Sequence, residues 1–150
     1  MKKFSVLFVA MLIALMLFVG CENKPKERAA TTDDLELVLK LGSGAIDTAD
    51  DAFGGKFDPA KIPGISMNKE KTIVTFDEFK ITNKSANITV IVCGTFTKTE
   101  NGFCLDLTKG TKLNGTGHTL YYNYSYEEAS VKQEIILDGV RLTDLDKFNK

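Results

Sequence analysis

The side chains that could carry chemistry in this 150-residue chain are few: three cysteines and a single histidine. A thiolate can act as a nucleophile, and an imidazole can bind a metal or move a proton. His118 has no second histidine with which to build a zinc site, and its place beside a predicted turn is typical of a surface residue. The chain contains no phosphate-binding loop, dinucleotide fingerprint, nucleophile elbow or calcium loop. We therefore expect a protein that is not an enzyme and that holds no metal or cofactor.

Cys93 and Cys104 fall on two neighbouring predicted strands that are joined by the turn Asn101-Gly102. This turn places Cys104 opposite Thr99, six residues along the strand from Cys93. Six residues of strand span about 20 Å, far beyond the distance that a disulfide can bridge. The sequence predicts two free thiols, and a disulfide is the alternative if the register at this turn is different.

A row of tyrosines alternates along one predicted strand and could stack a flat ligand: Tyr122, Tyr124 and Tyr126. Their predicted cross-strand partners are apolar, so packing in the core is the better explanation. Asp77 and Gln133 fall on the same predicted apolar face, where an unpartnered polar group costs free energy. They lie either at the uncovered rim of the sheet or in a small polar part of a ligand pocket. The candidate ligand-binding residues are Asp77, Phe79, Phe103, Tyr122, Tyr124 and Tyr126.

The second part of the chain is typical of strands, and five turn signals divide it. Asn-Gly and Asp-Gly are strong hairpin signals because both central residues need positive φ. They occur at 101–102, 114–115 and 138–139, and polar turns at 83–86 and 127–130 complete the set. The predicted strands are 72–82, 87–100, 103–113, 116–126, 131–137 and 140–146.

The turns also predict which residues share a face, because the numbers of opposed residues in a hairpin add up to a constant. Each turn pairs apolar residues with apolar residues, and a slip of one residue would turn the next strand over. The predicted pairs include Ile81 with Ile88, Phe96 with Leu107, Leu107 with Tyr122, Tyr126 with Val131, and Leu137 with Val140. The predicted core face comprises Ile73, Phe79, Ile81, Ile88, Val90, Val92, Phe96, Phe103, Leu105, Leu107, Leu120, Tyr122, Tyr124, Tyr126, Val131, Ile135, Leu137, Val140 and Leu142. The apolar exceptions on the other face are Val74, Phe76, Ile91, Tyr121 and Ile136.

One helix is predicted ahead of the strands, from about Thr32 to Phe53, with hydroxyl caps and acidic residues at its start. Gly42-Ser43-Gly44 marks either a kink or a close contact between helix and sheet. A sheet with one apolar face must cover that face, and the helix is the available cover. We predict an α+β fold in which an N-terminal helix packs on a six-stranded antiparallel meander. The sheet either stays open or curls toward a partial barrel.

The first twenty residues are of a different kind from the rest of the chain. Met1-Lys2-Lys3 is a short basic start, and the segment from Phe4 to Val19 carries no charge. A small-residue boundary and a polar run follow, as in a secretory signal peptide. The apolar stretch is slightly short for a spanning helix, which needs about 20 residues. An ordinary secretory signal and an uncleaved anchor are the alternatives to the resemblance described next.

The end of this segment, Phe18-Val19-Gly20-Cys21, resembles the lipobox of bacterial lipoproteins. Gly20 and Cys21 match the family pattern, whereas Phe18 stands where Leu is usual and Val19 is larger than usual. The resemblance implies cleavage before Cys21 and attachment of lipid to that cysteine. The chain then divides into a signal peptide (1–20), a flexible tether (21–30) and a single α+β domain (31–150).

Removal of Lys2 and Lys3 with the signal peptide changes the net charge from −1 to −3. A mildly acidic chain has no basic excess to bind nucleic acid. We expect a protein anchored through its lipid in the bacterial cell envelope, at the outer membrane or cell surface, with a non-catalytic interaction or structural role. Another envelope protein is the expected partner. The alternative is a binding protein for a small lipophilic ligand, held in a cavity between the helix and a curled sheet.

Overall fold

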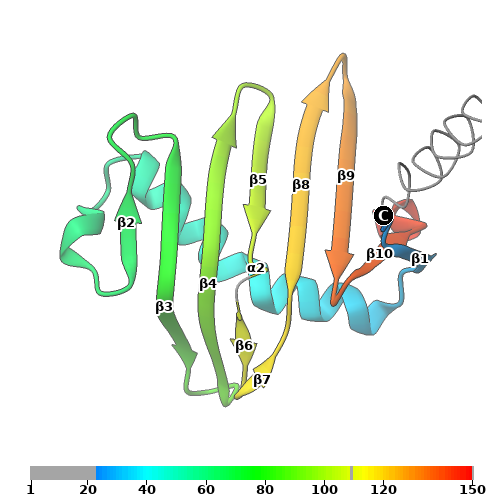
Figure 1. The fold of residues 1–150 in the computed structure, drawn as a ribbon, viewed down its shortest axis with the longest axis horizontal. Helices are drawn as coiled ribbons and strands as arrows, with labels where there is room; N and C mark the ends of the chain where they lie inside the picture. Colours follow the sequence, from blue (N-terminus) through cyan, green and yellow to red (C-terminus); the bar gives the residue numbers. More distant parts are fainter. Residues whose placement is uncertain (1–22, 109, 150) are drawn as a thin grey trace, which may run out of the picture.

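The computed structural model describes residues 23–108 and 110–149, and it has one long helix packed across one face of a large sheet (Figure 1). The predicted α+β class is therefore confirmed, but the sheet has ten strands and not six. The lipobox lies outside the described residues. The elements are β1 (Lys26–Ala29), α2 (Thr32–Phe53), η1 (Pro59–Lys61), β2 (Ile65–Met67), β3 (Ile73–Asn83), β4 (Ile88–Thr99), β5 (Gly102–Asp106), β6 (Lys112–Leu113), β7 (Thr116–Gly117), β8 (Leu120–Glu127), β9 (Ser130–Leu137), β10 (Val140–Thr143) and η2 (Leu145–Phe148).

The main path of the sheet runs in the order β1-β10-β9-β8-β5-β4-β3-β2, with β6 and β7 as a small hairpin beside β4. The sheet is open and does not close into a barrel. All pairs are antiparallel except β1 with β10, which are parallel. The predicted strand 103–113 is broken after Asp106, whose carboxylate accepts hydrogen bonds from the backbone and hydroxyl groups of Thr108. This turn directs the chain away from β5, so that β6 pairs with β4 instead.

The helix α2 has the predicted bounds and begins with a capping box. The hydroxyl of Thr31 accepts from the backbone N–H of Asp34 at 3.2 Å, and the carboxylate of Asp34 accepts from the backbone N–H of Thr31 at 2.9 Å. The helix continues through its two glycines because both lie against the sheet. A Cβ on Gly44 would be 2.5 Å from Cδ1 of Ile81, so close contact and not a kink explains this glycine.

The core lies between α2 and the sheet and contains mainly the predicted residues. The helix contributes Val38, Leu41, Ala45, Ala49 and Ala52, all at helical spacing. The strands and connections contribute Ile65, Val74, Phe76, Val90, Val92, Phe96, Leu105, Leu107, Leu120, Ile135, Leu137 and Leu142.

The register agrees with the predictions at two turns and differs at three. The pairs Tyr126–Val131 and Leu137–Val140 are confirmed. The β4–β5 and β5–β8 pairs are shifted by two residues from the predicted register, so that Phe96 faces Leu105. The β3–β4 pair is shifted by two from Phe79 to Asn83 and by one from Ile73 to Phe76. At β4–β5 the cause is Gly102, which belongs to the strand and not to the turn. A Cβ there would be 2.2 Å from the carbonyl oxygen of Tyr124. A shift of two keeps every side chain on its face.

The prediction that Val74 and Phe76 lie on the outer face is wrong. Both are buried under α2, and Ile73 lies on the outer face instead. A β-bulge between Phe76 and Phe79 reverses the alternation within β3, and Glu78 adopts a φ of 54° there. The bulge also moves Asp77, which the sequence placed on the core face, to an exposed position.

The expected flexible tether 21–30 is in part wrong as well, because β1 occupies Lys26–Ala29 and pairs with β10. The side chains of β1 are exposed, but that of Ala30, the next residue, is buried. The N–H of Ala30 donates to the carbonyl of Thr143 at 2.9 Å. Arg28 also pairs with the carboxylate of Asp34 in α2. Residues 26–30 are therefore part of the fold.

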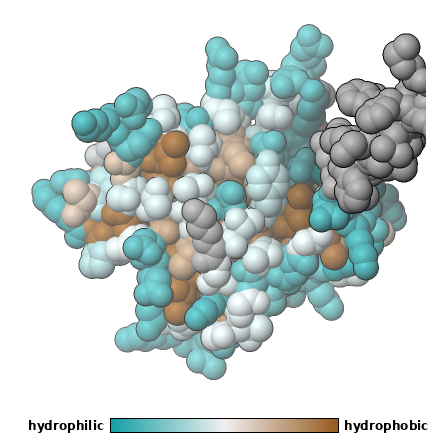
Figure 2. All heavy atoms as spheres, viewed as in Figure 1, coloured by the Kyte–Doolittle hydropathy of each residue, from teal (hydrophilic) through white to brown (hydrophobic). Residues whose placement is uncertain are grey.

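The sheet face opposite α2 has no second layer among the described residues (Figure 1). Figure 2 shows this face, with neutral and apolar side chains over its middle and hydrophilic ones around its margin. The predicted apolar exceptions Ile91, Tyr121 and Ile136 belong to this face and are half-buried. Within residues 23–108 and 110–149, no helix is both long enough and apolar enough to cross a membrane.

Candidate binding groove

A groove of about 740 Å³ lies between α2 and the helix-facing side of β8 and β9, and η2 forms one end of it. Its volume is in the range of sites that bind small molecules or peptide side chains. Its lining residues are Thr32, Leu35, Glu36, Val38, Leu39, Gly42, Ser43, Ile46, Asp47, Tyr122, Gln133, Ile135, Phe148 and Asn149.

The wall of the groove is a second apolar stripe on α2. Leu35, Leu39, Gly42 and Ile46 are spaced by four, three and four residues, so they follow one side of the helix next to its buried stripe. Leu39 is 70% exposed, the largest exposed fraction among the large apolar residues that are described. Helical spacing is a signal that could have identified this stripe, which was not predicted, but the sequence does not show that the sheet leaves it open.

The floor of the groove combines apolar side chains with one polar pair. The hydroxyl of Tyr122 donates to Oε1 of Gln133 at 3.3 Å, and Ile135 is buried beside them. Gln133 lies opposite Tyr124, as predicted, and its polar group on the apolar face is satisfied by this bond. Burial raises the pKa of Tyr122, so the hydroxyl stays protonated and available as a donor at neutral pH.

Phe103 is the centre of an aromatic cluster that supports Tyr122. Its ring lies 5.0 Å from that of Phe96 and 5.4 Å from that of Tyr124, both stacked. It meets Tyr122 edge-on at 5.6 Å. Such pairs add packing energy beyond burial. Phe103 and Tyr124 therefore lie behind the groove and do not line it.

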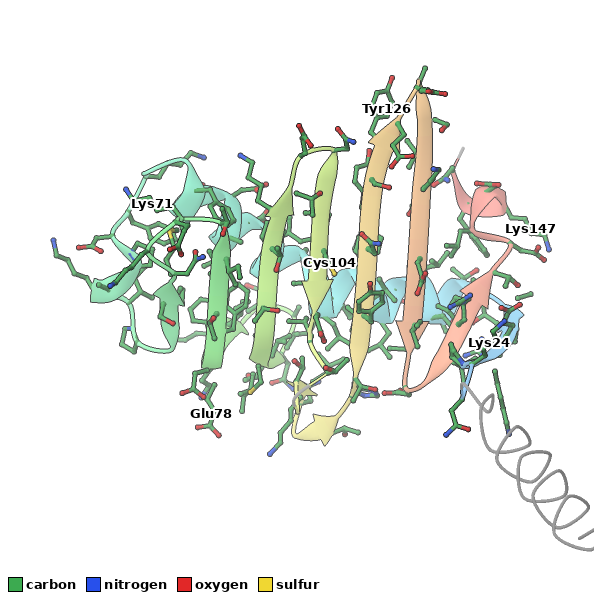
Figure 3. All side chains as sticks on the ribbon, turned by 45° about the horizontal axis from the view of Figure 1, so that its top comes forward. Lys24, Lys71, Glu78, Cys104, Tyr126 and Lys147 are labelled. Atoms are coloured by element: carbon green, nitrogen blue, oxygen red, sulfur yellow. The ribbon has the colours of Figure 1, made fainter. Side chains whose placement is uncertain are left out.

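The other three candidate residues are elsewhere. Asp77 is exposed on the β3 bulge, and Phe79 stacks on Phe76 at 5.9 Å in the same strand. Tyr126 is 53% exposed near the tip of the β8–β9 hairpin, opposite Val131 (Figure 3). Of the six candidates only Tyr122 lines the groove, and the α2 and η2 residues that complete it were missed.

The charged side chains that line the groove are both acidic. They are Glu36 and Asp47, on the exposed side of α2. Glu36 pairs with Lys40 at 2.6 Å, which lowers the pKa of its carboxyl through the hydrogen bond from Lys40. Asp47 makes no ion pair with any described residue. The wall of the groove therefore carries one paired and one unpaired carboxylate and no basic side chain, on a helix with six acidic residues and one lysine.

The thiols and the histidine do not converge on the groove. Cys104 faces Thr97, and Cys93 lies four residues further along β4, about 13 Å by strand geometry. Both are free cysteines. Burial raises the pKa of the Cys104 thiol, which makes it a poor nucleophile. Nδ1 of His118 lies 3.1 Å from a carboxylate oxygen of Asp138 at the end of β8.

No group of three or more His, Cys, Asp or Glu side chains in the described parts of the chain is arranged to hold a metal ion. The lining of the groove is mostly apolar and includes neither a cysteine nor a histidine. The chain matches no protein-family model, no curated protein and no solved structure.

Proposed function

We propose that this protein is a lipid-anchored bacterial envelope protein whose domain binds a segment of a partner protein and catalyses no reaction. The binding site is the groove between α2 and β8–β9. Its occupant is an amphipathic segment with apolar residues on one side and basic residues on the other. The resemblance of residues 18–21 to a lipobox supports the anchor, and the groove supports the binding role.

The observation that carries the binding role is the exposure of Leu39. A leucine that is 70% exposed next to a well-formed apolar groove leaves unburied area that a partner can cover. Full burial of such a side chain contributes about 1.5–3 kcal/mol. Phe148 lies at the end of the groove, beside α2.

The charge of the groove wall selects the partner. Acidic side chains beside apolar ones match the pattern of an amphipathic helix that lies in a groove, with basic residues facing the acidic rim. Opposite charge mainly raises the rate of encounter and excludes wrong partners, while the apolar contacts supply affinity. Glu36 and Asp47 are placed for the first role, and Leu35, Leu39 and Ile46 for the second.

A small lipophilic ligand is the second candidate. The polar pair Tyr122–Gln133 on an otherwise apolar floor favours it, because ligand sites commonly combine apolar walls with a few polar groups. The groove is open along one side of α2, however, and is not the interior of a curled sheet. An elongated segment fits an open groove better than a ligand that must be enclosed.

Two synthetic peptides with the same leucine pattern, one with lysines and one with glutamates, test the proposal. The probe is the fluorescence anisotropy of each labelled peptide with the domain from Asn23 onward, after circular dichroism has verified that this domain is folded. We expect the lysine peptide to bind and Leu39→Ser to weaken it about tenfold or more. Val131→Ser removes another exposed apolar side chain, outside the groove, and is expected to change nothing.

Equal binding of both peptides would refute the role of the acidic wall. A different result would favour the ligand carrier: neither peptide binds, and a solvatochromic lipophilic dye binds to the wild-type domain but not to Leu39→Ser. The anchor has its own test, because Cys21→Ser should move the protein from the membrane fraction to the soluble fraction. Retention in the membrane would refute lipid anchoring.

A further inference from the structure

The position of β1 limits how far the domain can move from its anchor. β1 begins at Lys26, only five residues after Cys21. An extended chain spans at most about 3.6 Å per residue, so Cys21 and Lys26 are at most about 18 Å apart. The previously expected tether up to Ala30 would have allowed nearly twice that distance.

β1 is joined firmly to one end of the molecule. It pairs with β10 along its whole length, and Arg28 donates to the carboxylate of Asp34 at 2.8 Å. The 22 residues of α2 extend about 33 Å across the sheet from this end toward β2 (Figure 1). The length of α2, about 33 Å, exceeds the span of at most about 18 Å between Cys21 and Lys26. The β2 end of the sheet therefore lies further from β1 than the lipid-bearing cysteine can.

The surface at the β1 end suits the headgroup region of a bilayer. Lys24 and Lys26 make no ion pair with any described residue, and Phe148 in η2 is 39% exposed. Lysines favour anionic headgroups, and an exposed phenylalanine on a surface that lies against a bilayer is buried at the boundary between headgroups and acyl chains. In Figure 3 Lys24 and Lys147 lie at this end of the molecule, and Lys71 lies at the opposite end.

The acidic side chains at the β1 end are largely neutralised. Glu27 lies 3.5 Å from Arg141, and Asp144 lies 2.6 Å from Lys147. Asp33, in the first turn of α2, and Asp146 are also exposed at this end, and neither makes an ion pair with a described residue. The ion pairs of Glu27 and Asp144 therefore reduce the repulsion by anionic lipid but do not remove it.

We propose that the edge formed by β1, β10 and η2 rests on the membrane surface, with Phe148 in the headgroup region and the β2 end directed away. This inference depends on the lipid anchor of the proposed function. The N-terminal half of α2 and the groove then lie next to the membrane, and a bound partner segment is itself close to the bilayer.

The chain contains no tryptophan, so a single introduced tryptophan reports on one position. Phe148→Trp marks the β1 end, and Phe57→Trp, beside β2, is the matched control at the other end. Each full-length lipidated protein is reconstituted into vesicles of phosphatidylethanolamine, phosphatidylglycerol and brominated phosphatidylcholine. Brominated lipid quenches tryptophan only at short distance. We expect strong loss of fluorescence for Phe148→Trp and little loss for Phe57→Trp.

A ten-residue Gly/Ser insertion between Glu22 and Asn23 is expected to reduce the loss at Phe148→Trp, because it lengthens the connection. Two outcomes in protein that floats with the vesicles would overturn the proposed orientation and leave the anchor intact. They are equal quenching at the two positions and no quenching at Phe148→Trp. Protein that does not float with the vesicles at all would overturn the anchor, and the orientation with it.

Discussion

Alanine in place of Gly42 and of Gly44 is expected to change the free energy of unfolding in opposite directions. Both glycines lie inside α2 and both face the sheet. The two substitutions add the same methyl group to the same helix, so any difference between them reports the local distance to the sheet.

At Gly42 there is room for the new methyl group. A Cβ would lie 3.6 Å from Cδ2 of Leu105 and 3.9 Å from Cδ1 of Ile46, which are ordinary van der Waals distances. Alanine is favoured over glycine in a helix by about 0.8–1.0 kcal/mol. Gly42→Ala should therefore raise the free energy of unfolding by up to about 1 kcal/mol.

At Gly44 the methyl group would collide with Ile81. A Cβ would lie 2.5 Å from Cδ1, 3.4 Å from Cγ2 and 3.5 Å from Cγ1 of that side chain. Cδ1 is the end of the side chain, so it must rotate about χ2 and leave its place against α2, and overpacking of this kind costs about 1–3 kcal/mol. After the gain in helix propensity, Gly44→Ala should lower the free energy of unfolding by up to about 2 kcal/mol.

Urea denaturation followed by circular dichroism of the full-length chain in detergent measures both changes. The double variant Gly44→Ala with Ile81→Val removes the colliding atom, so its loss should be smaller than the sum of the two single losses. If Gly44→Ala stabilises the protein as much as Gly42→Ala does, the close contact between α2 and β3 is refuted. Additive losses in the double variant would refute Ile81 as the cause.

Three further results are expected. Asp34→Asn should lower stability at neutral pH, because the hydrogen bond from Arg28 holds the pKa of Asp34 well below its usual range. The stabilisation by the ionised Asp34 is fully present above the ordinary pKa of the carboxyl group. It is lost as the pH falls through the lower pKa of the folded state, so the difference in free energy of unfolding between wild type and Asp34→Asn, measured by urea titration, should shrink in acid. Leu105→Ala should lower the free energy of unfolding by roughly 2–5 kcal/mol, since the side chain is fully buried, and an unchanged melting temperature would contradict its place in the core. Thiol titration of the denatured chain should detect Cys93 and Cys104 as reactive thiols. If neither reacts, the two residues form a disulfide.

Alternation in the sequence was enough to predict most of the sheet faces, because a shift of two residues in register does not change which side a residue faces. The predicted register was wrong between β4 and β5, yet Phe96 and Leu105 are buried as expected. Alternation failed in β3, where the bulge inserts one residue and buries Val74 and Phe76. β3 itself has no Gly or Pro at that bulge, and Gly94, which faces Phe76 from β4, does not show on which strand the extra residue lies.

The candidate site was less predictable than the core. The aromatic row was visible in the sequence, and it indicated packing, which is what Phe103 and Tyr124 provide. The groove depends on where α2 crosses the sheet, on the side of the helix that is left open, and on the return of η2 to its end. Such contacts join residues that are distant in sequence, and no local pattern specifies them.

Capping, helical spacing and alternation are local properties, so the amino-acid sequence is sufficient to predict the α+β class, the bounds of α2 and the face of most strand residues. It also carries the lipobox resemblance on which the proposed anchor depends. Three features are visible only in the folded protein: residues 26–29 form β1 beside β10, the sheet stays open, and a mostly apolar groove with two carboxylates lies beside α2. A parallel edge pair, a bulge and a groove each depend on contacts between segments that are distant in the sequence. Those contacts form only when the chain folds, so no local pattern in the sequence specifies them.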